Sequence, residues 1–133
     1  MKLSDDVKKV LKNNLWDLAT CADGHPNVVP VAFKDVMDDG KLVVGDVFLQ
    51  KTLENLAAND GRIAISVYDA KSLEGYQIQG RAVHETEGEL VQTFKGMVEQ
   101  MFHGAATAKG ALIITPETVI VTTPGKDNKK VLD

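Results

Sequence analysis

The sequence contains a single cysteine, Cys21, and no long hydrophobic run. One cysteine can neither close an intramolecular disulfide nor supply a thiolate zinc site, and its use agrees with a reducing compartment. The longest uncharged apolar run, residues 28–33, is far shorter than the roughly 20 residues that span a bilayer. The opening MKLSDDVKKV lacks the apolar core of a signal peptide. We therefore expect a soluble, cytoplasmic protein that does not act at a membrane.

Arginine is also scarce, because Arg62 and Arg81 are the only arginines among 15 basic residues. The formal net charge is -4, and the densest basic group, Lys126 with Lys129 and Lys130, is interrupted by Asp127. A nucleic-acid footprint needs clustered basic residues, so we expect no nucleic-acid partner. A small anion held by one or two well-placed groups stays compatible with this charge.

The remaining composition is that of an ordinary globular protein, with 44% hydrophobic and 26% charged residues. This excludes disordered, collagen-like and disulfide-scaffold classes. With 133 residues, the chain is long enough to bury a core of its own. We expect one domain over residues 1–133, with no linker and no internal repeat.

Hydrophobic periodicity and turn residues divide the chain into three helices and six strands. The helices are expected at residues 4–14, 50–59 and about 87–103, and Ser4 or Asp5 is placed to cap the first. The strands are expected at residues 15–21, 27–34, 41–46, 62–69, 75–85 and 111–122. The second and third strands are expected to be antiparallel neighbours. Gly80 predicts a bend or bulge, and Pro116 predicts an edge or a bulge.

Six strands joined mostly by short turns favour an α+β fold, mainly β, built on an antiparallel sheet. So long a sheet in so small a protein exposes two edges unless it curls into a barrel. We therefore expect a six-stranded antiparallel split β-barrel with flanking helices that cover its open ends.

A valine-rich strand ends and a helix begins in the stretch GDVFLQKTLENL, residues 45–56. A helix start presents unpaired backbone N–H groups and the positive end of the helix dipole. Lys51 and Thr52 add a cation and a hydroxyl donor there, which together suit a phosphate monoester. The other interpretation is that Thr52 caps the helix and Lys51 is a solvated charge.

The stretches KTLENLAAND (51–60), RIAISV (62–67) and GYQIQGRA (75–82) resemble the small FMN-binding split-barrel proteins of the pyridoxamine 5'-phosphate oxidase-like superfamily. The resemblance extends from the first helix to ALIIT at 111–115, and the order and spacing of these short motifs carry its specificity. It implies a homodimer with FMN bound at two sites along the dimer interface. It also implies an oxidoreductase or an electron-transfer protein that works through this flavin.

The resemblance assigns roles to particular positions. It implies that Lys51 and Thr52, preceded by Gln50, hold the phosphate. The segments implied to line the flavin are Val29, Pro30, Val31 and Ala32 in the second strand and Gly45, Asp46 and Val47 in the third. Gly45 would let the ring approach because it has no side chain. The strand around Gln77 and the loop at 105–109 are candidates for completing the pocket of a partner subunit.

Two departures from the oxidase pattern limit the functions that the resemblance implies. True pyridoxamine 5'-phosphate oxidases carry an arginine-rich C-terminal segment with an Arg-x-His element, and this chain has no arginine or histidine after His103. Gln50 stands where those oxidases have a basic residue, so we do not expect vitamin B6 oxidation. The alternative is a non-catalytic binding barrel that has lost the flavin or holds haem or a deazaflavin. Loss of the flavin is favoured by Gln50 and by the small number of aromatic residues that could stack on its ring.

The other candidates favour no chemistry. His25, His84 and His103 have no mutual ligand spacing, so we expect no metal site. Cys21 is expected to be a buried, inert thiol, and Asp38 with Asp39 to be turn residues. Met97, Met101 and Phe102 have the helical spacing typical of a core face, or of a partner contact in a dimer. We identify no catalytic acid or base, and no G-x-G-x-x-G turn that would mark a nicotinamide site.

Overall fold

The computed structural model describes residues 1–132. Its helices are α1 (Asp5–Asn13), α2 (Lys51–Ala58) and α3 (Glu89–Phe102). Its strands are β1 (Trp16–Ala22), β2 (His25–Val31), β3 (Lys34–Val36), β4 (Leu42–Asp46), β5 (Arg62–Tyr68), β6 (Gly75–Glu85), β7 (Gly110–Val121) and β8 (Val131–Leu132). All three expected helices are present, and Ser4 caps α1 by accepting a hydrogen bond from the Val7 amide at 3.3 Å.

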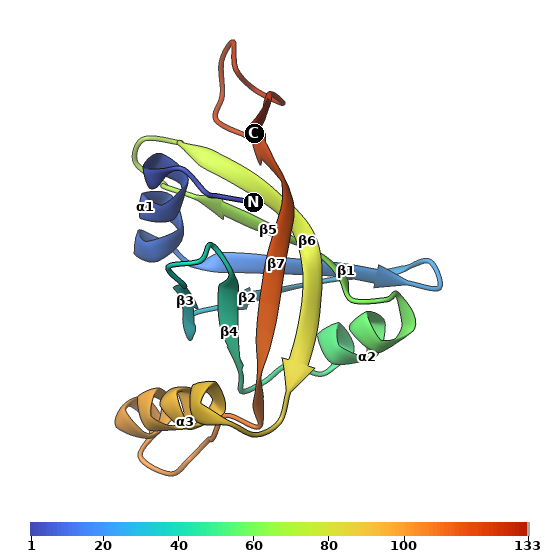
Figure 1. Ribbon diagram of the computed structural model, residues 1–133, viewed down its shortest axis with the longest axis vertical. Coiled ribbons are helices and arrows are strands. Elements are labelled where there is room, and N and C mark those ends of the chain that lie inside the picture. Colours follow the sequence, from blue (N-terminus) through green and yellow to red (C-terminus); the bar gives the residue numbers. More distant parts are fainter. Residues whose placement is uncertain (133) are drawn as a thin grey trace.

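The strands form one antiparallel sheet in the order β2-β1-β5-β6-β7-β4-β3, with β8 paired to β7. The sheet curls into a half-barrel, and the three helices lie at different margins of it (Figure 1). The predicted fold class is confirmed. The strand number differs, because β3 and β8 are two short strands that the hydrophobic pattern does not mark.

The expected strand 27–34 is divided, and this corrects the predicted neighbours. The chain bends at Ala32 and Phe33, so β2 ends at Val31 and β3 begins at Lys34. The Asp38–Gly40 turn then joins β3, not β2, to β4. Strands β2 and β4 consequently do not pair, and β2 and β3 form the two edges of the sheet.

Gly80 produces the predicted bulge in β6. The register with β7 shifts between Gln79, opposite Thr118, and Gly80, opposite Pro116. A Cβ atom at Gly80 would lie 2.3 Å from the carbonyl oxygen of Thr115, so only glycine fits this close approach of two backbones. Pro116 therefore marks a bulge in an interior strand.

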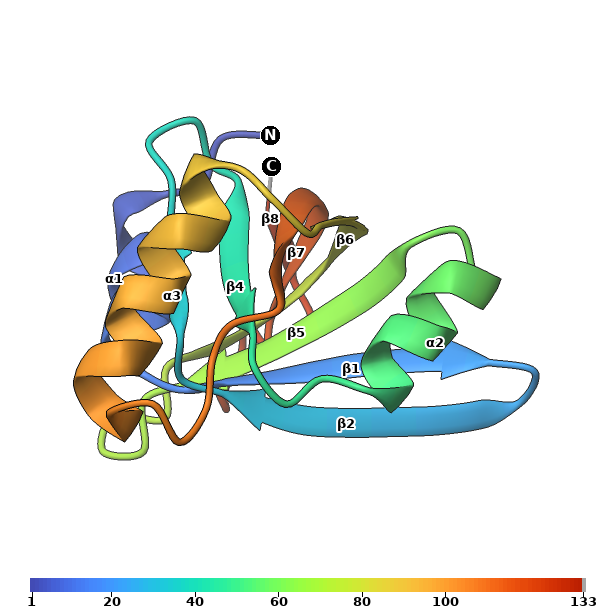
Figure 2. The same ribbon diagram turned by 90° about the horizontal axis from the view of Figure 1, so that it is seen from below.

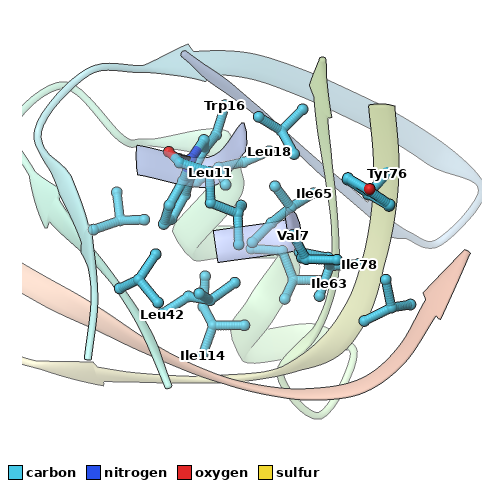
Figure 3. Packing of buried hydrophobic residues seen from close by; sticks show 14 of the residues in the cluster. Val7, Leu11, Trp16, Leu18, Leu42, Ile63, Ile65, Tyr76, Ile78 and Ile114 are labelled. Atoms are coloured by element: carbon cyan, nitrogen blue, oxygen red, sulfur yellow. Dashed lines mark hydrogen bonds between the residues drawn. The ribbon is translucent and has the colours of Figure 1, made fainter. Parts of the chain in front are cut away.

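The main core fills the concave side of the half-barrel (Figure 3). Fully buried side chains from α1 and from five strands meet there: Leu11, Trp16, Leu18, Leu42, Ile65, Ile78 and Ile114. Helix α1 is fixed to this core at Leu11, whose carbonyl accepts hydrogen bonds from the Trp16 indole at 2.8 Å and the Lys34 amine at 3.1 Å. Burial lowers the pKa of the Lys34 amine, which lies 5.2 Å from the Trp16 ring centroid.

A second, smaller core lies under α3. Phe94, Val91 and Val98 of this helix pack against Val43 and Ala111 of β4 and β7. Figure 2 shows α3 beside β4, whereas α2 lies beside β1 and β2 on the other side of the loop that follows β4. No helix in residues 1–132 has the length and apolar character needed to cross a membrane.

Candidate functional site

The start of α2 is the centre of the candidate site. Gln50 occupies the N-cap position and, within residues 1–132, makes no side-chain capping hydrogen bond. The first-turn N–H groups therefore stay available to an external acceptor. Lys51 is exposed as the first residue of the helix. Thr52 follows it inside the helix, so the expectation that Thr52 caps the helix is wrong, whereas the exposure of Lys51 agrees with a solvated charge.

Thr52 joins α2 to the edge strand β2. Its side chain is 1% exposed, and its hydroxyl oxygen accepts a hydrogen bond from the Asn27 side-chain amide at 3.1 Å. One turn later the buried Asn55 side-chain amide donates to the Thr20 hydroxyl of β1, also at 3.1 Å. These two bonds fix the orientation of α2. Since the Thr52 oxygen is the acceptor in its bond, its own proton stays free to be donated.

Lys109 supplies a second cation next to this helix start. Its backbone N–H donates to the Asp46 carbonyl at 2.7 Å, and its Nζ lies 3.4 Å from the Leu49 carbonyl oxygen. The first acceptor belongs to the last residue of β4, and the second lies in the loop between β4 and α2. The loop at 105–109 was expected to serve a partner's pocket, and its last residue contacts the α2 loop of its own chain.

The predicted segment at residues 29–32 lies on an open edge. Val29 and Val31 are half-buried against the main core, whereas Pro30 and Ala32 are exposed. Within the described chain β2 pairs with β1 alone, so half of its backbone groups are not used by the sheet. This edge, next to Thr52, can offer backbone donors and acceptors to a ligand.

All three residues of the predicted segment Gly45, Asp46 and Val47 are buried. A Cβ at Gly45 would lie 2.8 Å from Cδ1 of Phe94, so the missing side chain serves the packing of α3. The Gly45 N–H donates to the Phe33 carbonyl at 2.8 Å. The residues of this segment that were predicted to line a flavin thus pack against Phe33 and α3.

Asp46 forms a pair with His84 that the sequence did not indicate. The Asp46 carboxylate is 1% exposed, and its Oδ2 lies 3.0 Å from Nε2 of His84 in β6. Its Oδ1 has no hydrogen-bond partner among residues 1–132. The pair ties the end of β6 to the loop that leads into α2, although β4 and β6 are not neighbours in the sheet.

Gln77 lies on the outward face of the sheet. Its strand, β6, is separated by β5 from β1 and β2, the strands with which α2 makes most of its contacts. The Gln77 side-chain oxygen accepts a hydrogen bond from the Gln79 amide at 2.9 Å. Gln77 is paired with Ser66 of β5 and with Ile120 of β7, and these residues belong to a face of the sheet with few charges. A shallow cavity of about 810 Å³ lies over the same face, bounded by Val28, Ala64 and Gln79 among others.

Three of the four phenylalanines gather beside the candidate site, and sequence periodicity gave no signal for this. The ring centroid of Phe33, which follows β2, lies 6.0 Å from the ring centroid of Phe102 at the end of α3. The ring centroid of Phe48, which follows β4, also lies 6.0 Å from that of Phe102, and the two ring planes are at 86° to each other. The low aromatic content of the sequence therefore concealed a local aromatic cluster.

Two expectations about burial are wrong. Cys21 is exposed at the end of β1. Met97 and Met101 are 40% and 62% exposed, because the buried face of α3 is formed by Val91, Phe94 and Val98 instead. Phe102 is half-buried against the smaller core.

Comparisons with known proteins agree with the class that this fold defines, a split-barrel protein. The family model described as pyridoxamine 5'-phosphate oxidase matches residues 3–126, and the chain belongs to this family. No curated protein matches the sequence.

Solved structures show the same fold over most of the chain. HupZ of Group A Streptococcus is 27% identical, with a TM-score of 0.80 over 95% of this chain and 98% of that one. An FMN-binding protein of Syntrophomonas wolfei subsp. wolfei is 16% identical, with a TM-score of 0.77 over 90% of this chain and 86% of that one. An F420 reductase is 17% identical, with a TM-score of 0.66 over 88% of this chain and 98% of that one.

The donors at the α2 start fit the phosphate of a flavin mononucleotide. Lys51 and Lys109 supply positive charge, the Thr52 hydroxyl supplies a proton, and the first-turn N–H groups point out of the helix end. The open edge of β2 next to them has the backbone groups that a flat heterocycle requires.

Proposed function

We propose that this protein binds FMN and acts as a small oxidoreductase or electron-transfer protein. The observation that carries the proposal is the start of α2, where Lys51 and Thr52 stand at a helix N-terminus that no side chain of the described residues caps. A dianionic phosphate supplies the missing acceptor and is favoured by the helix dipole. FMN, when bound, supplies the electron-transfer chemistry.

The chain's own residues bind and orient the cofactor in this proposal. Lys51, Lys109 and the Thr52 hydroxyl hold the phosphate. Val29, Pro30, Val31 and Ala32 present the edge of β2 to the flavin, and the segment Gly45–Val47 lines it through its backbone, because its residues are buried. The Asn27 bond to Thr52 at 3.1 Å holds the phosphate end and the strand edge in a fixed relation.

The proposal includes a homodimer formed through the outward face of the sheet. The outward residues of β2, β1, β5 and β6 lie in cross-strand rows: Pro30, Asp17, Ser66 and Gln77 in one, and Val28, Ala19, Ala64 and Gln79 in the next. These rows contain one charged residue, and Val28 is 63% exposed. A face of small and weakly charged residues suits close approach of a second sheet.

Vitamin B6 oxidation is not part of the proposal. The C-terminal segment has lysines and no arginine, and it borders a cavity with Leu3, Ser4 and Val7 of the N-terminal region. Figure 1 shows this segment at the end of the molecule remote from α2. Within one chain, the C-terminal segment is therefore too remote to contact a substrate bound at the start of α2.

A binding barrel that holds haem or a deazaflavin is the second candidate. It is favoured by Gln50, an uncharged side chain at the N-cap where a basic residue would strengthen phosphate binding. The likeness to an F420 reductase also agrees with a deazaflavin, at the level of the fold.

The absorption spectrum of the purified protein separates these candidates. A flavin spectrum, release of FMN on denaturation, and saturable uptake of added FMN at one molecule per chain support the first proposal. Anaerobic addition of NADH and NADPH then tests whether a nicotinamide reduces the bound flavin. A colourless protein that takes up haemin or a deazaflavin, but not FMN, contradicts the first proposal and supports the second.

A further inference from the structure

Phe48 is the most exposed large hydrophobic side chain in the described part of the chain, at 73%. A single exposed apolar residue needs no explanation by itself. Phe48, however, stands at the outer end of an aromatic series whose inner members, Phe102 and Phe33, are anchored in the smaller core. The ring is thus held in place, while most of its surface faces outward.

The loop that carries Phe48 is also fixed on both sides. Lys109 binds the Asp46 carbonyl before Phe48 and the Leu49 carbonyl after it, at 2.7 and 3.4 Å. Little conformational entropy remains to be lost when a ligand packs on a ring held in this way. The position has the character of a preformed platform for a flat ligand.

Phe48 lies three residues before Lys51, and its cluster partner Phe33 directly follows Ala32. Three extended residues span at most about 10 Å, a length comparable with the ribityl chain that separates the phosphate of FMN from its ring. The cluster therefore adjoins both segments assigned to the flavin, through Phe33 at the end of 29–32 and through Phe48 before Lys51. We propose that Phe48 packs against the isoalloxazine ring of FMN and forms the aromatic wall of its site.

This inference rests on the proposed function and adds a ring contact to it. The alternative occupant of the Phe48 surface is the partner subunit. A flavin contact predicts an effect of Phe48 on flavin affinity, whereas a partner contact predicts an effect on the oligomeric state. A ring contact contributes equally to the binding of FMN and riboflavin, because both carry the same ring. A phosphate contact such as that of Lys51 contributes to FMN alone.

The test compares Phe48→Leu, which keeps an apolar side chain and removes the ring, with Phe48→Tyr, which keeps the ring. Met101→Ala is the matched control, because Met101 is 62% exposed and lies next to Phe102 in the chain. Lys51→Ala serves as the phosphate-end comparison. Titration calorimetry measures the affinity for FMN and for riboflavin, flavin fluorescence measures quenching by a stacked ring, and sedimentation measures the oligomeric state.

We expect Phe48→Leu to weaken FMN and riboflavin by the same factor, roughly tenfold, and to raise the fluorescence of bound flavin. Phe48→Tyr and Met101→Ala should retain wild-type affinity. Unchanged affinities in Phe48→Leu, or a dimer that dissociates while the affinity per chain is kept, overturn the ring contact. Wild-type protein that binds neither flavin overturns the proposed function itself, together with this inference.

Discussion

The side-chain amide of Asn27 in β2 donates a hydrogen bond of 3.1 Å to the hydroxyl oxygen of Thr52 in the first turn of α2. The bond joins a sheet edge to a helix start that are 25 residues apart in the chain. In the proposed FMN site, stability and ligand binding would share one contact, because the same hydroxyl that accepts from Asn27 has a proton to donate to phosphate.

Thr52→Val tests this shared contact, since valine has nearly the shape of threonine and lacks the hydroxyl. Removing the acceptor leaves the half-buried Asn27 amide without its partner, so the free energy of unfolding should fall by about 1–2 kcal/mol. Urea denaturation measures this, and titration with FMN should show weaker binding. Thr122→Val, at an exposed position after β7, is the control. A midpoint equal to that of the wild type would show that the bond contributes nothing.

Lys51→Ala should weaken FMN binding by about 1–3 kcal/mol, because it removes a charge-assisted contact. Its effect on the free energy of unfolding should stay within about 0.5 kcal/mol, since the side chain is exposed. Calorimetric titration with FMN and with riboflavin measures the difference, which should appear for FMN only. Lys12→Ala, at the end of α1, is a matched loss of an exposed lysine. Equal FMN affinity in both variants would remove Lys51 from the phosphate site.

Lys109→Ala should weaken FMN binding less than Lys51→Ala does, because the Lys109 amine also contacts the Leu49 carbonyl at 3.4 Å. Lys109→Arg keeps the charge and should restore most of the affinity. Riboflavin binding should be unaffected by either variant. Lys126→Ala, in the C-terminal segment, controls for a general loss of positive charge. An FMN affinity that falls equally for Lys109 and Lys126 would indicate long-range electrostatics and no specific contact.

His84→Ala should destabilise the protein by about 1–3 kcal/mol, because it leaves a buried carboxylate without a partner. Asp46 is 1% exposed and its other oxygen has no partner among residues 1–132, so His84 is the one side chain that pairs with this carboxylate in the described residues. Urea denaturation at pH 7 measures the effect, and His25→Ala, at an exposed strand start, is the control. If Asp46→Asn in the same background restores the stability, the cost arises from the unpaired charge.

Local signals in the sequence were sufficient for the helices and for the class of fold. The three-and-four spacing of Val7, Val10 and Leu11 marks α1, and Ser4 caps it as expected. The division of β2 from β3 could not be predicted, because the bend at Ala32 and Phe33 interrupts an apolar run that contains no glycine. Sequence periodicity describes which residues are apolar, and only the curling of the sheet decides where such a run must turn.

The candidate site was predicted only in the parts that are contiguous in sequence. Lys51 and Thr52 form a motif that can be read along the chain, whereas Asn27 and His84 reach the site from the strands β2 and β6. Lys109 lies in a loop that the resemblance assigned to the pocket of a partner subunit and that contacts the α2 loop of its own chain. The resemblance placed Gly45 near the flavin, but the contact that requires a glycine there comes from Phe94 in α3. Pairings of this kind depend on tertiary packing, which a single sequence does not report.

Gly80→Ala should be among the most destabilising single substitutions in the sheet. The new Cβ would meet the Thr115 carbonyl oxygen at 2.3 Å and the Pro116 Cα at 3.2 Å, so two backbones in adjacent strands must separate. We expect a loss of about 2–4 kcal/mol, since neither neighbour is a flexible side chain. Gly96→Ala is the matched control, because a Cβ there meets nothing within 4 Å and lies in a helix, where alanine should stabilise by about 0.5–1 kcal/mol. Opposite shifts of the urea midpoint in the two variants would establish that the bulge at Gly80 is required by close backbone contact, whereas a small loss at Gly80 would show that β7 can move away without cost.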